Sequence, residues 1–220
     1  AQKGAGDGVD LDAYRDVVDQ FGVTEFVGYA NDVAESRVLA VVLTDDGAVD
    51  IFLDRTPFYA ESGGQIGDTG TITTATGRAI VLDTTFALPN LRRHRARLES
   101  GTITPGQTAT AEIDADRRVA IRRNHTATHL LHHALRHVLG DHVKQAGSMV
   151  GPDRLRFDFS HYDAVTDEQI LEIERKIEGE IKSHLELLEH SGDVQWIREG
   201  KVNATGTERF EQTVVNIAPL

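Results

Sequence analysis

The feature that most constrains the fold is a change of hydrophobic pattern near residue 119. Before it, short β-rich runs alternate with glycine-bearing turns, and after it apolar residues recur every three or four positions. The first pattern is typical of antiparallel sheets and the second of amphipathic helices. We therefore expect an α+β chain with an N-terminal tail and short helix (1–22), a small antiparallel β-barrel (23–118) and an α+β domain (119–220).

Two predicted hairpins support the prediction of a barrel. The apolar runs 38–43 and 49–53 flank Asp45-Asp46-Gly47, a strong turn signal, and residues 72–82 predict a second hairpin around Thr76-Gly77. Ahead of them, apolar residues at helical spacing predict a short helix that ends at Gly22.

The second half of the chain combines helices with strands. Asn124 has the side chain of an N-cap, and the apolar stripe that follows it predicts a helix ending before Gly140. Residues 155–159 alternate like a strand, residues 167–188 have helical periodicity, and the last residues, from Val214, resemble another strand.

Composition excludes several classes of protein. The 220 residues contain no cysteine, so disulfides are excluded and any metal must be held by His, Asp, Glu or water. No apolar run approaches the roughly 18 residues that span a bilayer, and the first residues lack the apolar segment of a secretory signal. We expect a cytoplasmic protein without a membrane partner.

Positive charge is concentrated in one stretch of an acidic chain. The formal net charge is -12, yet residues 92–123 contain eight arginines against four acidic residues. A confined basic patch suits a protein that grips one end of a nucleic acid, although arginines can also simply decorate exposed strands. The candidate contacts are Arg92, Arg93, Arg95, Arg122, Arg123 and Lys144.

A histidine pair is the sharpest candidate for chemistry. His125 and His129 are four residues apart, so on a helix they project from one face and can converge on a metal ion. Thr126 stands where metalloprotease signatures carry a glutamate, so that reaction lacks its general base. The same helix carries three further histidines, and a polar histidine-rich face without any ligand is the structural alternative.

A glycine-rich loop is the second candidate. Residues 56–70 contain glycines at 63, 64, 67 and 70, which allow close approach of a ligand to the backbone, and Gln65 among other polar side chains. As a pattern alone, the segment also fits a long turn.

Taken together, four motifs resemble the editing region of alanyl-tRNA synthetase, which is also found in free-standing editing proteins. The motifs are Thr24–Tyr29, the block 53–70, the block 124–132 and the run 140–161, and the likeness covers residues 12 to about 183. The resemblance implies a β-barrel followed by an editing domain of the alanyl/threonyl-tRNA synthetase type. It further implies a deacylase that acts in trans, because neither the ATP-binding core nor the C-terminal domain of the synthetase is in the sequence.

The resemblance also implies roles for individual residues. His125 and His129 correspond to zinc ligands, Thr128 and Gln145 to pocket residues beside the aminoacyl group, and Gly63, Gly64, Gln65 and Asp158 to substrate-binding positions. The Cys-x-x-x-His motif that supplies the other zinc ligands is missing. Zinc is therefore expected to be weak or absent, unless His184, His190 or a carboxylate replaces the missing ligands or water completes the set. Without the metal, His125 or His129 is free to act as a general base.

The expected function is hydrolysis of a mischarged tRNA bearing serine, glycine, or a threonine-like or non-proteinogenic amino acid. The partner is the tRNA acceptor end rather than DNA. The alternative is a degenerate tRNA-binding module that keeps the fold without catalysis. The sequence leaves the oligomeric state open.

Overall fold

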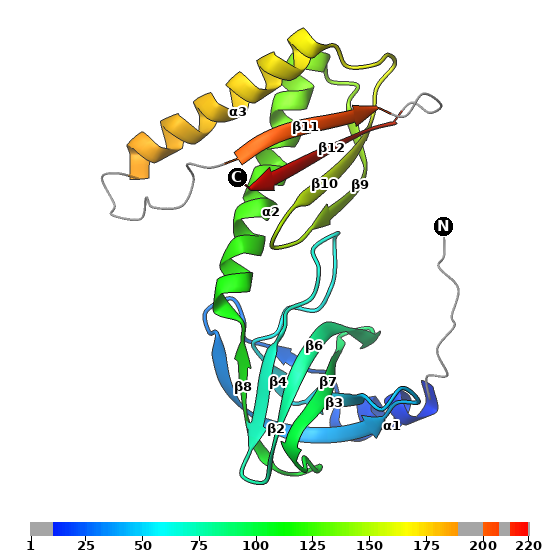
Figure 1. Cartoon of the computed structure of the whole chain (residues 1–220). Helices are drawn as coiled ribbons and strands as arrows, with labels where there is room; N and C mark the ends of the chain where they lie inside the picture. Colours follow the sequence, from blue (N-terminus) through cyan, green and yellow to red (C-terminus); the bar gives the residue numbers. More distant parts are fainter. Residues whose placement is uncertain (1–10, 189–199, 207–211, 220) are drawn as a thin grey trace. The chain divides into compact units, whose positions relative to one another are not determined.

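The protein consists of two compact units. The structure, a computed structural model, describes residues 11–188, 200–206 and 212–219 (Figure 1). The first unit comprises residues 1–62 and 67–118, and the second comprises residues 63–66 and 119–220. The segment Gly63–Ile66 falls inside the range expected for the barrel, but its contacts assign it to the second unit.

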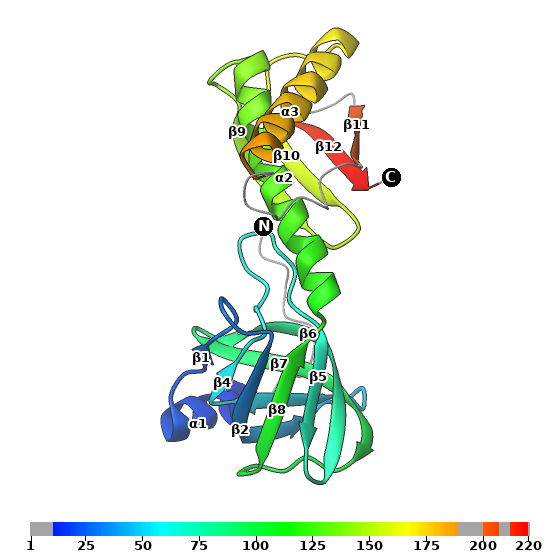
Figure 2. The same ribbon diagram turned by 90° about the vertical axis from the view of Figure 1, so that its left-hand side faces the viewer.

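The first unit is a closed antiparallel barrel of six strands, in the order β2-β3-β7-β6-β5-β8 (Figure 2). This confirms the expected barrel and both predicted hairpins. The strands are β2 (Val33–Leu43), β3 (Val49–Leu53), β5 (Gly70–Thr74), β6 (Gly77–Leu88), β7 (Leu91–Gly101) and β8 (Thr108–Ile113). A separate parallel pair is formed by β1 (Glu25–Phe26) and β4 (Arg55–Thr56).

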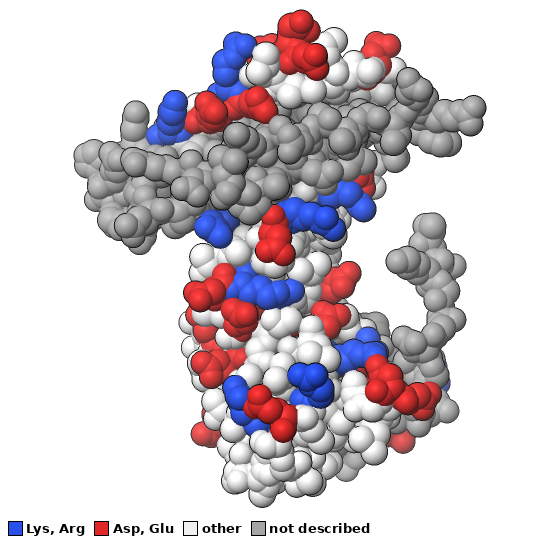
Figure 3. All heavy atoms as spheres, viewed as in Figure 1, with Lys and Arg blue, Asp and Glu red and all other residues white. Residues whose placement is uncertain are grey.

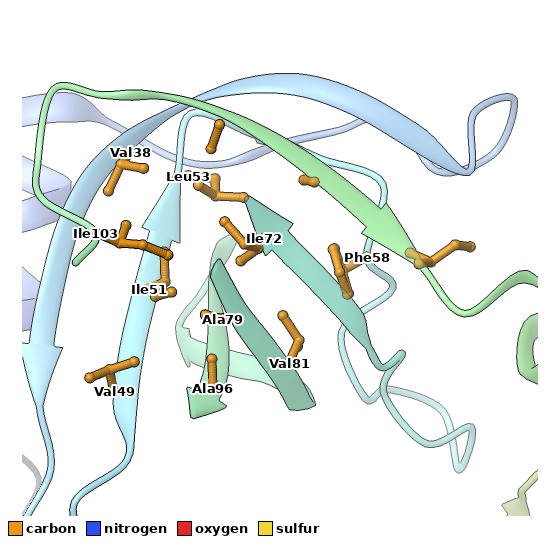
Figure 4. Packing of buried hydrophobic residues seen from close by; sticks show 13 residues of the cluster. Val38, Val49, Ile51, Leu53, Phe58, Ile72, Ala79, Val81, Ala96 and Ile103 are labelled. Carbon is orange, nitrogen blue, oxygen red and sulfur yellow. The ribbon is translucent and has the colours of Figure 1, made fainter. Parts of the chain in front are cut away.

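Alternate residues of the strands fill the barrel interior. The buried cluster includes Val49, Ile51 and Leu53 of β3 together with Ile72 of β5 and Val81 of β6 (Figure 4). Successive strand residues point to opposite faces, so the intervening residues of β3 face outward. The whole of β3 is nevertheless buried, which requires a cover on its outer face.

Helix α1 (Leu11–Phe21) supplies that cover. Tyr14 and Val17 pack with Phe52 of β3 in a second buried cluster, and the Tyr14 hydroxyl donates a 2.5 Å hydrogen bond to the buried carboxylate of Asp50. The helix ends as predicted before Gly22, whose φ of 80° is favourable only for glycine.

The second unit places two helices on one antiparallel sheet. The sheet order is β11-β12-β10-β9, and Phe157 and Phe159 of β10 share a buried cluster with Leu135 of α2 and Ile173 of α3. The elements are α2 (Ala115–Leu139), β9 (Lys144–Val150), β10 (Leu155–Ser160), α3 (Asp167–Leu188), β11 (Gly200–Gly206) and β12 (Gln212–Pro219). Among the described residues, no helix is both long and apolar enough to cross a membrane.

The predicted start of helix α2 at Asn124 is wrong. The helix begins at Ala115, and Asp114 caps it by accepting a 2.9 Å hydrogen bond from the Arg117 amide. Asn124 lies inside the helix, where its side-chain amide donates to the carbonyls of Gly151 and Pro152 at 2.7 and 3.1 Å. Its role is therefore to hold the turn between β9 and β10. The predicted end is correct, because Gly140 follows the helix with a φ of 110°.

Candidate functional site

The glycine-rich loop extends the sheet of the second unit. Gly64 accepts a 2.7 Å hydrogen bond from the Val150 amide, and the Ile66 amide donates to the Val150 carbonyl at 3.1 Å. Gln65 and Val150 form an isolated parallel bridge. The loop is thereby fixed along the edge strand β9, and the side chain of Gln65 is buried.

Gly64 is required at this edge for two reasons. Its φ is 84°, and a Cβ at this position would lie 2.4 Å from the Ser148 hydroxyl and 2.6 Å from the Ser148 carbonyl oxygen. Gly63 also has a positive φ, of 60°, but a Cβ there would meet nothing within 4 Å. The close approach of the loop to β9 thus depends on Gly64 rather than on Gly63.

The loop meets the histidine pair through Gln65. The side-chain oxygen of Gln65 lies 2.8 Å from Nδ1 of His125. With the amide assigned this way round, the oxygen can only accept, so Nδ1 of His125 carries the donated proton. The neutral ring then has its lone pair on Nε2, which is available to a substrate, a water or a metal.

The second histidine lies beside the first. The ring centroids of His125 and His129 are 5.1 Å apart. Burial lowers the pKa of His125 below its ordinary value, and the positive charge of a protonated His129 lowers it further. His125 is therefore neutral at neutral pH, as a general base must be.

Thr128, on the same helix as the pair, and Gln145, on β9, each have part of their hydrogen-bonding capacity used. The buried Thr128 hydroxyl donates to the Asn124 carbonyl at 2.8 Å, which leaves its oxygen as an acceptor. The Gln145 amide donates to the Ser148 hydroxyl at 3.0 Å, and Ser148 contacts Gly64. Gln145 is thus joined to the loop through a serine that the sequence did not single out.

Asp158 is not brought to the histidine pair. It alternates along β10 with Phe157 and Phe159, which face the helices, so its side chain lies on the opposite face of the sheet. There it lies close to Gly147, and its Oδ1 is 3.2 Å from Nε of Arg156. Its implied place beside the substrate is not supported by this geometry.

The described residues do not form a complete set of ligands for a metal ion. No group of three or more His, Asp or Glu side chains in the described part of the chain is arranged to hold an ion. His125 and His129 alone make an incomplete set, since structural zinc sites have four protein ligands. The side chain of His184 and the whole of His190 lie outside the described residues, so their substitution for the missing ligands stays an expectation.

The six basic candidates differ in their surroundings. Arg93 and Arg95 of β7 have acidic neighbours in the barrel, Asp50 at 3.9 Å and Asp46 in direct contact, whereas Arg92 lies among aromatic rings. Arg122 and Arg123 on α2, and Lys144 on β9, form no ion pair among the described residues. On the face drawn in Figure 3, basic and acidic side chains are interspersed.

Comparisons with known proteins agree on one group of relatives. Residues 2–117 match the family model of class II (A) tRNA synthetases. The alanine–tRNA ligase of Cereibacter sphaeroides is 47% identical over 189 residues, which cover 82% of this chain and 21% of that protein. The alanine–tRNA ligase of Wolbachia pipientis is 44% identical over 180 residues, covering 77% and 20%. That of Acetivibrio thermocellus is 49% identical over 166 residues, covering 72% and 19%. The chain spans about a fifth of the length of these relatives.

Proposed function

Because the chain belongs to the family of class II (A) tRNA synthetases and is related to the alanyl-tRNA synthetases, we propose that it hydrolyses the ester bond of mischarged aminoacyl-tRNA. The observation that carries the proposal is the 2.8 Å contact between Gln65 and His125, which leaves Nε2 of His125 as a free lone pair. Action in trans, as in the free-standing editing proteins that the chain resembles, is part of this proposal.

The chemical step uses His125 as a general base. Nε2 takes a proton from a water molecule, and the resulting hydroxide attacks the carbonyl carbon of the ester. The bond between that carbon and the ribose oxygen then breaks, and the ribose oxygen takes the proton back from His125. The products are the free amino acid and the uncharged tRNA. An aminoacyl ester is already labile, so a positioned water and a neutral base suffice.

Specificity follows from the acceptors that remain on Thr128 and Gln145. The Thr128 hydroxyl has given its proton to the Asn124 carbonyl, and the Gln145 amide nitrogen is engaged by Ser148. Both side chains therefore offer oxygen atoms that accept from a substrate hydroxyl. A hydroxylated side chain such as serine meets this requirement and alanine does not, which is the discrimination that polar pockets perform well.

We propose that zinc binding is weak or absent. When bound, zinc would orient the substrate or polarise its carbonyl from His125 and His129. The proton transfers described above use only side chains of this chain. Metal analysis of protein purified without chelator tests this point, and one tightly held zinc per chain would contradict it.

Contact with the tRNA is proposed for Arg122, Arg123 and Lys144, whose charges have no carboxylate partner in the described structure. Replacing Arg122 and Arg123 with alanine should weaken tRNA binding and flatten its dependence on salt. For Arg93 and Arg95 a smaller effect is expected, since their charges are partly balanced by Asp50 and Asp46.

The proposed activity is tested by incubating the chain with seryl-, glycyl- and threonyl-tRNA and measuring release of the amino acid. Release well above the uncatalysed rate from at least one of them is expected. Zero turnover on every ester with retained tRNA binding would favour the non-catalytic module.

A further inference from the structure

The barrel carries a cluster of aromatic rings around one arginine. The guanidinium carbon of Arg92 lies 4.6 Å from the centre of the Phe26 ring and 5.2 Å from that of Phe86. Phe26 in turn meets the rings of Tyr29 and Tyr59 at 4.9 and 6.3 Å, both nearly edge-on. We call these five residues the Arg92 aromatic patch. All five belong to the first unit.

Part of the patch is open to solvent. Tyr29 is 86% exposed and Phe86 39% exposed, whereas the barrel interior is filled by other side chains. Exposed apolar area is unfavourable in water, so a cluster of large rings at the surface usually marks a place where a binding partner covers them. The rings therefore mark an interaction surface rather than a part of the core.

The charge of Arg92 indicates which partner fits. Its Nη1 donates to the Thr24 carbonyl at 3.2 Å, and its buried Nε has no hydrogen-bond partner. In the described structure no carboxylate pairs with Arg92, unlike the neighbouring Arg93 and Arg95. An apolar protein surface placed over the patch would bury this charge without a counter-ion, which is costly. A polynucleotide brings bases for the rings and phosphates for the charge.

We propose that the Arg92 aromatic patch binds unpaired nucleotides of RNA, with a base stacked on Tyr29 or Phe86 and a phosphate near Arg92. The inference rests on the proposed function for the identity of the RNA, namely the single-stranded 3′ end of a tRNA. It does not involve the ester, so it is tested without any hydrolysis.

The first test measures the binding of a fluorescent single-stranded RNA of 12 nucleotides by anisotropy. Tyr29→Ala is expected to weaken RNA binding about fivefold or more. Removing one aromatic side chain on which a base stacks has an effect of this size in other proteins that bind single strands. Tyr29 is so exposed that its removal should leave the fold intact, which a thermal melt checks. Tyr162→Ala is the matched control, because Tyr162 is 77% exposed in the second unit and outside the patch. Its affinity should equal that of the unaltered chain.

The second test locates the RNA without a substitution. Ultraviolet cross-linking of the same RNA, followed by peptide mass spectrometry, should give adducts on the peptides containing Tyr29 or Phe86. Undiminished binding by Tyr29→Ala and Phe86→Ala, or an equal loss in Tyr162→Ala, would overturn the proposal. Adducts confined to the second unit would do so too. Absence of deacylation with intact, patch-dependent RNA binding would refute only the proposed function.

Discussion

The side-chain oxygen of Gln65 lies 2.8 Å from Nδ1 of His125, although the two residues are 60 positions apart in the chain. A loop side chain thereby fixes which nitrogen of the helical imidazole carries the proton. The loop is itself fixed by backbone hydrogen bonds to Val150. The proposed reaction depends on this pair.

Changing Gln65 to glutamate should alter the pH dependence of turnover. A carboxylate beside His125 stabilises the imidazolium and raises the pKa of His125. The general base is active when neutral, so activity rises with pH through that pKa, and the rise should move to higher pH by about one unit. The measurement is kcat/KM between pH 5 and 8. Gln20→Glu, on the exposed side of α1, adds the same charge elsewhere and should leave the profile unchanged.

Gly64→Ala should be far more damaging than Gly63→Ala. Both positions have positive φ, so each substitution strains the backbone by about 1 kcal/mol. Only at position 64 does the new Cβ collide with Ser148. The loop should then move away from β9 and take Gln65 away from His125. The rate of hydrolysis of a mischarged tRNA should therefore fall much further in Gly64→Ala than in Gly63→Ala. Equal turnover by the two variants would show that the loop need not lie against β9.

Asn124→Asp distinguishes the two roles considered for Asn124. At an N-cap, aspartate and asparagine are nearly equivalent, so the change would be tolerated. In the observed position the side chain donates to two carbonyls, and a carboxylate cannot donate. The free energy of unfolding, measured with urea, should fall by about 1 to 3 kcal/mol. Asp114→Asn, at the actual cap, is the control and should have little effect.

His94 should make the barrel sensitive to acid. The ring is fully buried between the Ile51 carbonyl and the Thr56 hydroxyl, and burial lowers its pKa from 6.5 to about 4. A depressed histidine pKa contributes stability that is present above pH 6.5 and is lost as the pH falls through 4. The loss approaches about 3 kcal/mol below pH 4, from roughly 1.36 kcal/mol per pKa unit.

The check is urea unfolding at pH 7, 5 and 4. His94→Gln should flatten the dependence of the unfolding free energy on pH in this range. The control is His133→Gln, because the side chain of His133 is 63% exposed. An unchanged slope in His94→Gln would contradict the assignment.

Local patterns predicted most of the fold. The Asp45-Asp46-Gly47 turn, the stop at Gly22 and the end of α2 at Gly140 were all identifiable, since each depends on a residue with a special backbone preference. The start of α2 was missed because residues 115–124 are mostly polar and carry no apolar stripe. Asp114 could have been chosen as the cap, but Asn124 stands directly before the stripe.

The sequence identified residues of the candidate site but not the contacts between them. Spacing identified His125 and His129, and the glycines marked the loop, but no local pattern reveals that Gln65 contacts His125. That contact arises from the pairing of Gly64–Ile66 with Val150, which is a long-range event. Asp158 was predicted because it lies in one of the family's motifs. The alternation of side chains along β10 places it on the face of the sheet away from the histidine pair.

The role of His125 as the general base is tested most directly by single-turnover hydrolysis of seryl-tRNA by the unaltered chain and by His125→Ala at pH 7. We expect measurable hydrolysis by the unaltered chain and a rate at least about a hundredfold lower in the variant, because a general base contributes about that factor. The affinity for tRNA should be retained. Equal rates for the two proteins would show that His125 is not the base.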